Sequence, residues 1–277
     1  MGQVLGALLR ALLVGLMVTT PAVLLPQVGA DSAQIVVLFA IFAGVLTLIE
    51  YAARYPGLVE FRYAPPYNRI RFGALFVTLL LLSFFYRGQT DPGTFAQFVG
   101  ALGGLVGGAA DFAYSPVRLL LLSLPSDTPP ATVAQLRSAL GLALLVALAA
   151  FVVFVLTLWR SSWPLRHRAF NVWVNLPTFD PTAGGDVVDR LERDARVNAM
   201  LGFLLPFLIP AGMIAAGSVA PPLSDAGAQT QIWIVAVWAF LPACLLMRGV
   251  ALARIARIIR DRRSREAAGE AAGLQPV

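Results

Sequence analysis

The sequence predicts an all-α protein, a polytopic membrane helix bundle of six transmembrane helices with an additional glycine-rich, re-entrant or interfacial helix on the periplasmic side. Of the 277 residues, 58% are hydrophobic and only 13% are charged, and the mean hydropathy is +0.76. A water-soluble domain of this composition lacks the polar residues needed to cover its surface. Several apolar segments are also about 20 residues long, which is the length of a helix that spans the hydrocarbon core of a bilayer.

Six segments have the required length and apolar character. They are residues 4–25, 34–53, 73–86, 139–159, 199–219 and 232–252, of which the third is short and is completed by Ile70 and Phe72. We expect one membrane domain over 1–260, with cytoplasmic loops at 51–72 and 160–198, followed by a cytoplasmic, disordered tail at 261–277.

The first segment has two interpretations. Arg10, the apolar run after it and the small residues at 28–30 resemble a secretory signal with its cleavage site. Pro21 and Pro26 bracket its end, and the apolar run is long for a signal, so a retained helix is favoured. The topology of the other segments is the same in either case.

Arginine counts decide whether residues 94–124 cross the membrane, because cytoplasmic loops carry the excess of positive charge. All 21 basic residues are Arg. If 94–124 does not cross, 17 of them lie in the cytoplasm; if it crosses, the best orientation places 14 there. The first arrangement is preferred, with both termini cytoplasmic and the glycine-rich segment on the periplasmic side.

The stretch "GALGGLVGGAADF" at 100–112 predicts a helix-packing surface. Its glycines recur every four residues in two series, namely Gly100, Gly104 and Gly108, and Gly103 and Gly107. On a helix they form a smooth stripe that another backbone can approach closely. A phosphate-binding loop is disfavoured, since that motif needs a preceding strand and a Lys, and the chain has no Lys.

Asp111 closes this stretch and is a possible buried acid. An acid at membrane depth is costly and usually faces protein or water, so Asp111 is a candidate proton or cation site. The alternative, which we favour, places it at the interface, either paired with Arg118 or capping the helix that starts after Ser115-Pro116.

The loop at 51–72 alternates aromatic residues with Arg around a Pro-Pro break. It is either an anchor at headgroup level or a rigid docking platform with Glu60 and Arg62 exposed. The candidate docking residues are Glu60, Arg62, Tyr63, Tyr67, Arg69 and Arg71.

The loop at 160–198 combines an expected extended segment at 170–176 with an amphipathic helix near its end. Asp186 is expected to cap this helix. Acids are followed four residues later by Arg, as in Asp186 with Arg190 and Glu192 with Arg196. This spacing favours a solvated helix face with internal ion pairs over a metal or catalytic site.

The residue inventory disfavours catalysis. The chain has one His, His167, and one Cys, Cys244, so we expect no catalytic group, no metal and no cofactor. The net charge of +6 is explained by Arg between apolar segments rather than by nucleic-acid binding. The Ala, Gly, Pro, Leu and Arg bias is typical of a GC-rich bacterial genome, which points to the bacterial cytoplasmic (inner) membrane.

The expected function is that of a non-catalytic membrane accessory, scaffold or assembly factor. Its partners would be the lipid bilayer and either another membrane protein or a second copy of the chain. The alternative is a small transporter or lipid-handling protein in which Asp111 is the functional acid.

Overall fold

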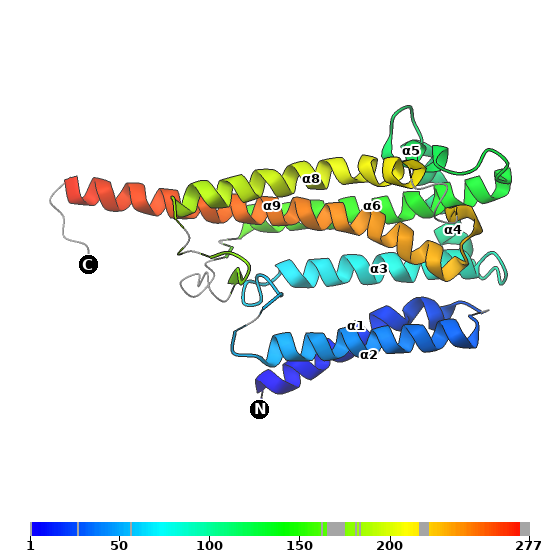
Figure 1. Ribbon diagram of the computed structural model, residues 1–277, viewed down its shortest axis with the longest axis horizontal. Helices are drawn as coiled ribbons and strands as arrows, with labels where there is room; N and C mark the ends of the chain where they lie inside the picture. Colours follow the sequence, from blue (N-terminus) through cyan, green and yellow to red (C-terminus); the bar gives the residue numbers. More distant parts are fainter. Residues whose placement is uncertain are drawn as a thin grey trace.

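The computed structural model describes residues 2–26, 28–55, 57–161, 163–164, 175–180, 182, 184–215 and 222–271. Over these residues the secondary structure is helical and contains no strand (Figure 1). The elements are α1 (Gly2–Leu24), α2 (Ala30–Ala52), α3 (Tyr67–Arg87), α4 (Thr94–Ala110), α5 (Pro116–Leu122), α6 (Pro130–Arg160), α8 (Val187–Ala215), a 3-10 turn η1 (Leu223–Asp225) and α9 (Ala228–Ala271). The predicted extended segment at 170–176 lies almost entirely outside the described residues, as does His167.

Six of the described helices are long and apolar enough to cross a membrane, namely α1, α2, α3, α6, α8 and α9. They match the six segments predicted from the sequence and confirm an all-helical fold with the features of a multi-pass membrane bundle. Several are longer than the apolar runs inside them: α6 begins at Pro130 and α8 at Val187. The apolar run therefore predicts the part of a helix that spans the bilayer, and polar helix-forming residues extend it.

The long helices lie side by side in two groups (Figure 1). Helices α3, α6, α8 and α9 form the body, in which α8 packs extensively on α9, and α1 and α2 pair as a hairpin beside it. The hairpin meets the body mainly where α1 contacts α3. Many apolar side chains of α2 are exposed, such as Phe39 and Phe42, as expected for a helix whose outer faces meet lipid.

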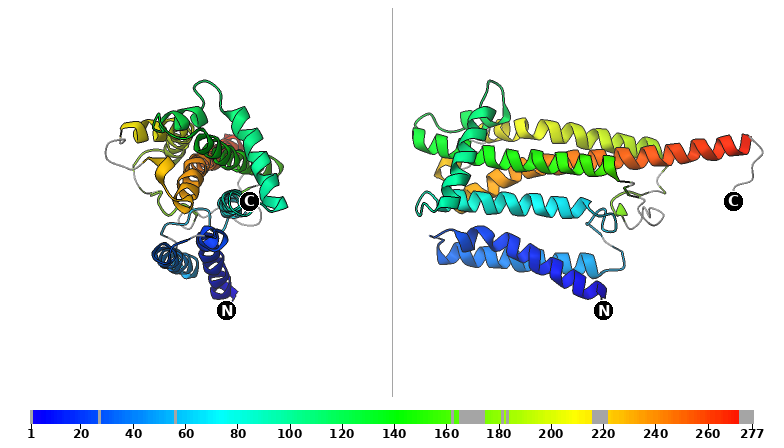
Figure 2. Two further views of the ribbon diagram at one scale, coloured as in Figure 1. Left: turned by 90° about the vertical axis from the view of Figure 1, so that its right-hand side faces the viewer. Right: turned by 180° about the vertical axis from the view of Figure 1, so that it is seen from behind.

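The two ends of the bundle differ in what they carry. The start of α1, the α2–α3 loop and the last turns of α9 lie at one end, which we call the terminal end (Figures 1 and 2). The α1–α2 connection, α4 and α5 lie at the other, which we call the far end. There α4 runs crosswise to the long helices, at the periphery of the bundle (Figure 2).

Helix α9 extends beyond the point at which the sequence predicted the helical domain to end. Residues 261–271, assigned to a disordered tail, are helical. Ala, Arg and Glu are strong helix formers, and Arg262 Nε donates to Glu266 Oε1 at 2.8 Å, one turn later. Arg263 NH1 also donates to Asp186 Oδ2 at 2.6 Å, which ties this stretch to the start of α8.

The charged start of α8 forms contacts that the local pattern did not predict. Asp186 caps the helix as expected, since its Oδ1 accepts the Val188 N–H at 2.6 Å. Its carboxylate also binds Arg263 of α9, and Glu192 binds Arg260 of α9, so the predicted pairing of these acids with Arg190 and Arg196 is replaced by pairing between helices. The Arg263 hydrogen bond, followed by the Val188 N–H, lowers the pKa of Asp186.

Candidate functional site

The glycine stripe of α4 is divided between two faces of the helix. Gly103 and Gly107 are buried where α4 crosses α6, and Gly141 of α6 lies opposite them. A Cβ on Gly107 would lie 2.3 Å from the Arg137 carbonyl oxygen, and one on Gly141 would lie 2.3 Å from the Gly107 nitrogen. The backbones of α4 and α6 are therefore in direct contact, and any side chain larger than hydrogen at these glycines would prevent that contact.

The other glycines of the stripe make no close backbone contact with the rest of the described chain. Gly104 and Gly108 are exposed, and a Cβ at Gly108 would meet nothing within 4 Å. At Gly104 the nearest atom would be the Ser138 hydroxyl oxygen at 3.9 Å, and Gly100 faces only the Phe85 ring, at 3.9 Å. The α4 face that carries Gly104 and Gly108 is therefore available for contact with another molecule.

Asp111 lies just after α4 and is held by two arginines. Arg118 Nε is 2.7 Å from Asp111 Oδ1, and Arg137 NH1 is 3.7 Å from Oδ2. The Asp111 side chain is only 9% exposed, whereas those of both arginines are more than 40% exposed. The predicted pairing with Arg118 is present, and the cap of α5 is provided by Ser115, whose hydroxyl accepts the Arg118 N–H at 3.0 Å.

Glu60 is buried rather than exposed, which corrects the expectation of an open docking surface there. Its side chain is 10% exposed and forms a two-pronged ion pair with Arg248 of α9, at 2.7 and 2.8 Å. The Thr178 hydroxyl donates to the same carboxylate at 2.8 Å. The 51–72 loop therefore folds inward onto α9 at this acid.

Tyr67 also belongs to the interior rather than to a docking surface. Its ring lies 4.5 Å from that of Phe61 and 5.5 Å from that of Phe154, all three being fully buried. Phe61 has a φ of 53°, an uncommon value for a non-glycine residue, and its N–H donates to the Asn175 carbonyl at 2.7 Å. Packing and hydrogen bonding together stabilise this turn of the 51–72 loop.

Arg62 binds the carboxyl end of α2. Its NH1 donates to the carbonyls of Glu50 and Ala53, and its NH2 donates to the Tyr63 hydroxyl at 2.7 Å. Cations at a helix C-terminus neutralise the carbonyls that have no partner within the helix. Of the six candidate docking residues, Tyr63 and Arg69 are the exposed ones, so the predicted platform is reduced to these two.

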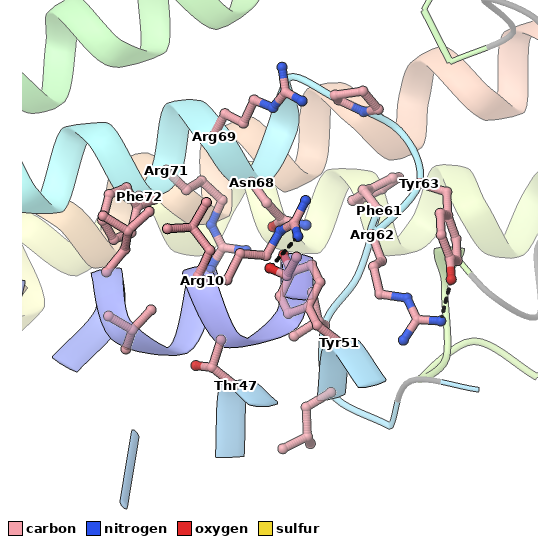
Figure 3. A pocket seen from close by; sticks show the side chains of 17 residues that line it. Arg10, Thr47, Tyr51, Phe61, Arg62, Tyr63, Asn68, Arg69, Arg71 and Phe72 are labelled. Atoms are coloured by element: carbon pink, nitrogen blue, oxygen red, sulfur yellow. Dashed lines mark hydrogen bonds between the residues drawn. The ribbon is translucent and has the colours of Figure 1, made fainter. Parts of the chain in front are cut away.

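A partly open cavity of about 890 Å³ lies at the terminal end, between the α1–α2 hairpin and α3. Helix α1 contributes Arg10, Leu9 and Leu13, and α2 contributes Tyr51. The α2–α3 loop and α3 add further residues, which are Leu58, Val59, Phe61, Arg62, Tyr63, Pro65, Asn68, Arg69, Arg71 and Phe72. Figure 3 shows the Arg10 guanidinium beside the Tyr51 ring, whereas Arg69 points away from the cavity.

The sequence did not predict this cavity. In the sequence, Arg10 belongs to the signal-like pattern of the first segment, and Arg71 is one of the candidate docking residues. The signals available were a single Arg in the apolar segment 4–25 and an Arg within one turn of the start of the third span. Neither indicates that the two side chains line one cavity, because that depends on how α1 packs on α3.

Comparison of the chain with protein-family models, curated proteins and solved structures gives no match.

Proposed function

We propose that the protein is a non-catalytic scaffold, accessory or assembly factor of the bacterial cytoplasmic membrane, which binds a membrane-protein partner or a second copy of itself. The observation that carries the proposal is the free face of α4, where Gly104 and Gly108 are exposed beside Phe98 and Leu105. Helices in a bilayer associate through close backbone packing at small residues, because lipid provides no hydrophobic drive. Gly103 and Gly107 make such a contact within the chain, and Gly104 and Gly108 are suited to make one outside it.

The proposed orientation places the terminal end in the cytoplasm and α4 at the periplasmic surface. The loops and tail at the terminal end carry most of the arginines, in agreement with the positive-inside rule. Helix α4 has 17 residues and runs crosswise to the spanning helices (Figure 2). A short apolar helix in that orientation fits the boundary between headgroups and hydrocarbon, where its free face meets neighbouring membrane proteins.

Replacing Gly104 and Gly108 together with Leu is expected to weaken association about tenfold, because the two side chains would hold the partner helix away, at a cost of about 1.4 kcal/mol. Association is measured by affinity purification from native membranes in mild detergent with quantitative mass spectrometry, together with cross-linking of differently tagged copies. Gly212→Leu is the matched control, since Gly212 is exposed on α8 and a Cβ there meets nothing within 4 Å. Equal recovery from both variants would contradict the proposal.

The alternative, a small transporter or lipid-handling protein with Asp111 as its functional acid, has a separate test. If the protein is a scaffold, proteoliposomes that contain it will move a fluorescent phospholipid between leaflets no faster than protein-free liposomes. A faster rate that is abolished by Asp111→Asn while association survives would favour the alternative. The pairing of Asp111 with Arg118 and Arg137 supports a structural role for this acid.

A further inference from the structure

The lining of the cavity at the terminal end carries four arginines, Arg10, Arg62, Arg69 and Arg71. No Asp or Glu is among its lining residues in the described part of the chain. Arg10, Arg62 and Arg71 line the cavity together with Tyr51, so three guanidinium groups lie around one region. Like charges in a partly apolar cavity repel one another strongly unless an anion lies between them.

Arg10 and Arg71 form hydrogen bonds and ring contacts with neutral groups. Arg10 NH1 donates to the Gly6 carbonyl at 2.6 Å, and the guanidinium lies 4.8 Å from the centre of the Tyr51 ring. Arg71 Nε donates to Cys244 Sγ at 3.3 Å and lies 5.3 Å from the centre of the Tyr67 ring. Among the described residues, neither arginine forms an ion pair.

The carboxylates of the adjoining segments are engaged elsewhere. Glu50 Oε2 accepts the backbone N–H groups of Gly57, Leu58 and Val59 at 2.9 to 3.0 Å. Glu60 is held by Arg248 through two hydrogen bonds. The charge of Glu60 acts on Arg71, but both acids stay bound to these other partners, and the cavity lining keeps an excess of positive charge.

We propose that this cavity binds an anionic phospholipid, with the phosphate group between Arg10 and Arg71. Guanidinium groups bind phosphate through paired, charge-assisted hydrogen bonds. Leu9, Leu13 and Phe72 give the same cavity an apolar wall on which the first part of an acyl chain packs. A volume of about 890 Å³ lies within the range of small-molecule sites.

The position of the cavity agrees with this ligand. Tyr51 is next to the last residue of α2, and Arg10 is about two turns into α1, so both lie near the ends of spanning helices where headgroups are found. Basic pockets between transmembrane helices bind anionic headgroups in this way. A soluble phosphate ester would use the two arginines but not the apolar wall. Lipid binding at this cavity does not depend on the partner proposed for α4.

The test uses the purified full-length protein in dodecyl maltoside and native mass spectrometry with three probes. They are dioctanoyl phosphatidylglycerol, dioctanoyl phosphatidylcholine and glycerol 1-phosphate. We expect phosphatidylglycerol to bind at least tenfold more tightly than phosphatidylcholine, and glycerol 1-phosphate to bind more weakly than either. Tight binding of glycerol 1-phosphate equal to that of phosphatidylglycerol would identify a soluble phosphate ester as the ligand and would overturn the lipid assignment.

The variant Arg10→Gln/Arg71→Gln is expected to lose at least tenfold in affinity for phosphatidylglycerol. Arg10→Gln alone is the second variant, because the Arg10 interactions within the described residues are a hydrogen bond to its own helix and the contact with the Tyr51 ring. It should lose several-fold in affinity while thermal unfolding without lipid stays unchanged. The matched control is Arg257→Gln/Arg265→Gln, which removes two exposed charges from α9. Equal losses in the cavity variant and the control, or no lipid preference in the natural sequence, would overturn the proposal.

Discussion

Replacing Arg248 with Met is expected to lower the free energy of unfolding by about 3–5 kcal/mol, the cost of leaving a buried charge without its partner. Arg248 is the group that neutralises Glu60, whose side chain is 10% exposed, and the pair joins the α2–α3 loop to α9. Once Arg248 is gone, the Thr178 hydroxyl is the hydrogen-bond donor that remains for the carboxylate among the described residues. The measurement is unfolding of the purified protein in detergent, by heat or by added dodecyl sulfate.

Arg257→Met is the matched control, because Arg257 is an exposed Arg on the same helix. Its expected effect is within about 0.5 kcal/mol, as for other surface substitutions. The double variant Glu60→Gln/Arg248→Met should recover part of the loss, because it removes the unpaired charge as well as its partner. If Arg248→Met and Arg257→Met unfolded alike, the ion pair would not stabilise the fold.

Replacing Gly107 with Ala is expected to destabilise the protein by about 1–3 kcal/mol, the usual cost of adding atoms to a tightly packed interior. The new methyl group would lie 2.3 Å from the carbonyl oxygen and 2.8 Å from the carbonyl carbon of Arg137. Both are backbone atoms, so no side chain can move away to make room, and α4 would have to lift off α6. Thermal unfolding in detergent measures the loss.

Gly108→Ala, one residue along the same helix, separates this clash from the general effect of a glycine replacement. A methyl group there meets nothing within 4 Å. Ala stabilises a helix relative to Gly, so we expect no change or a gain of up to about 1 kcal/mol. Gly141→Ala should resemble Gly107→Ala, since its methyl group would lie 2.3 Å from the Gly107 nitrogen. Similar stabilities for the 107 and 108 variants would show that α4 and α6 can move apart without loss of stability.

The features that could be predicted are those that depend on residues close together in the sequence. Six spans follow from the length of each apolar run, and the cap by Asp186 follows from the residues after it. Contacts between distant segments are different. Glu60 and Arg248 are 188 positions apart, and only the packing of the α2–α3 loop on α9 brings them together.

The candidate sites illustrate the same limit. A period of four predicted a smooth α4 surface, but the crossing direction of α6 selects Gly103 and Gly107 as the buried pair and leaves Gly104 and Gly108 free. The local charge pattern suggested that Glu192 pairs within its own helix, whereas Arg260 of α9 is closer. Secondary structure is therefore readable from the sequence, and the choice among equivalent contacts is made by tertiary packing.

The length of α9 has a consequence for any domain or tag attached to the C-terminus. With 44 residues and a rise of about 1.5 Å each, the helix is about 66 Å long, roughly twice the thickness of the hydrocarbon core. Two ion pairs join the C-terminal part of α9 to the start of α8, Arg263 with Asp186 and Arg260 with Glu192. A fluorophore attached at Ala271 would be held at the end of this helix, and energy transfer from it to a lipid dye would report the tilt of the helix.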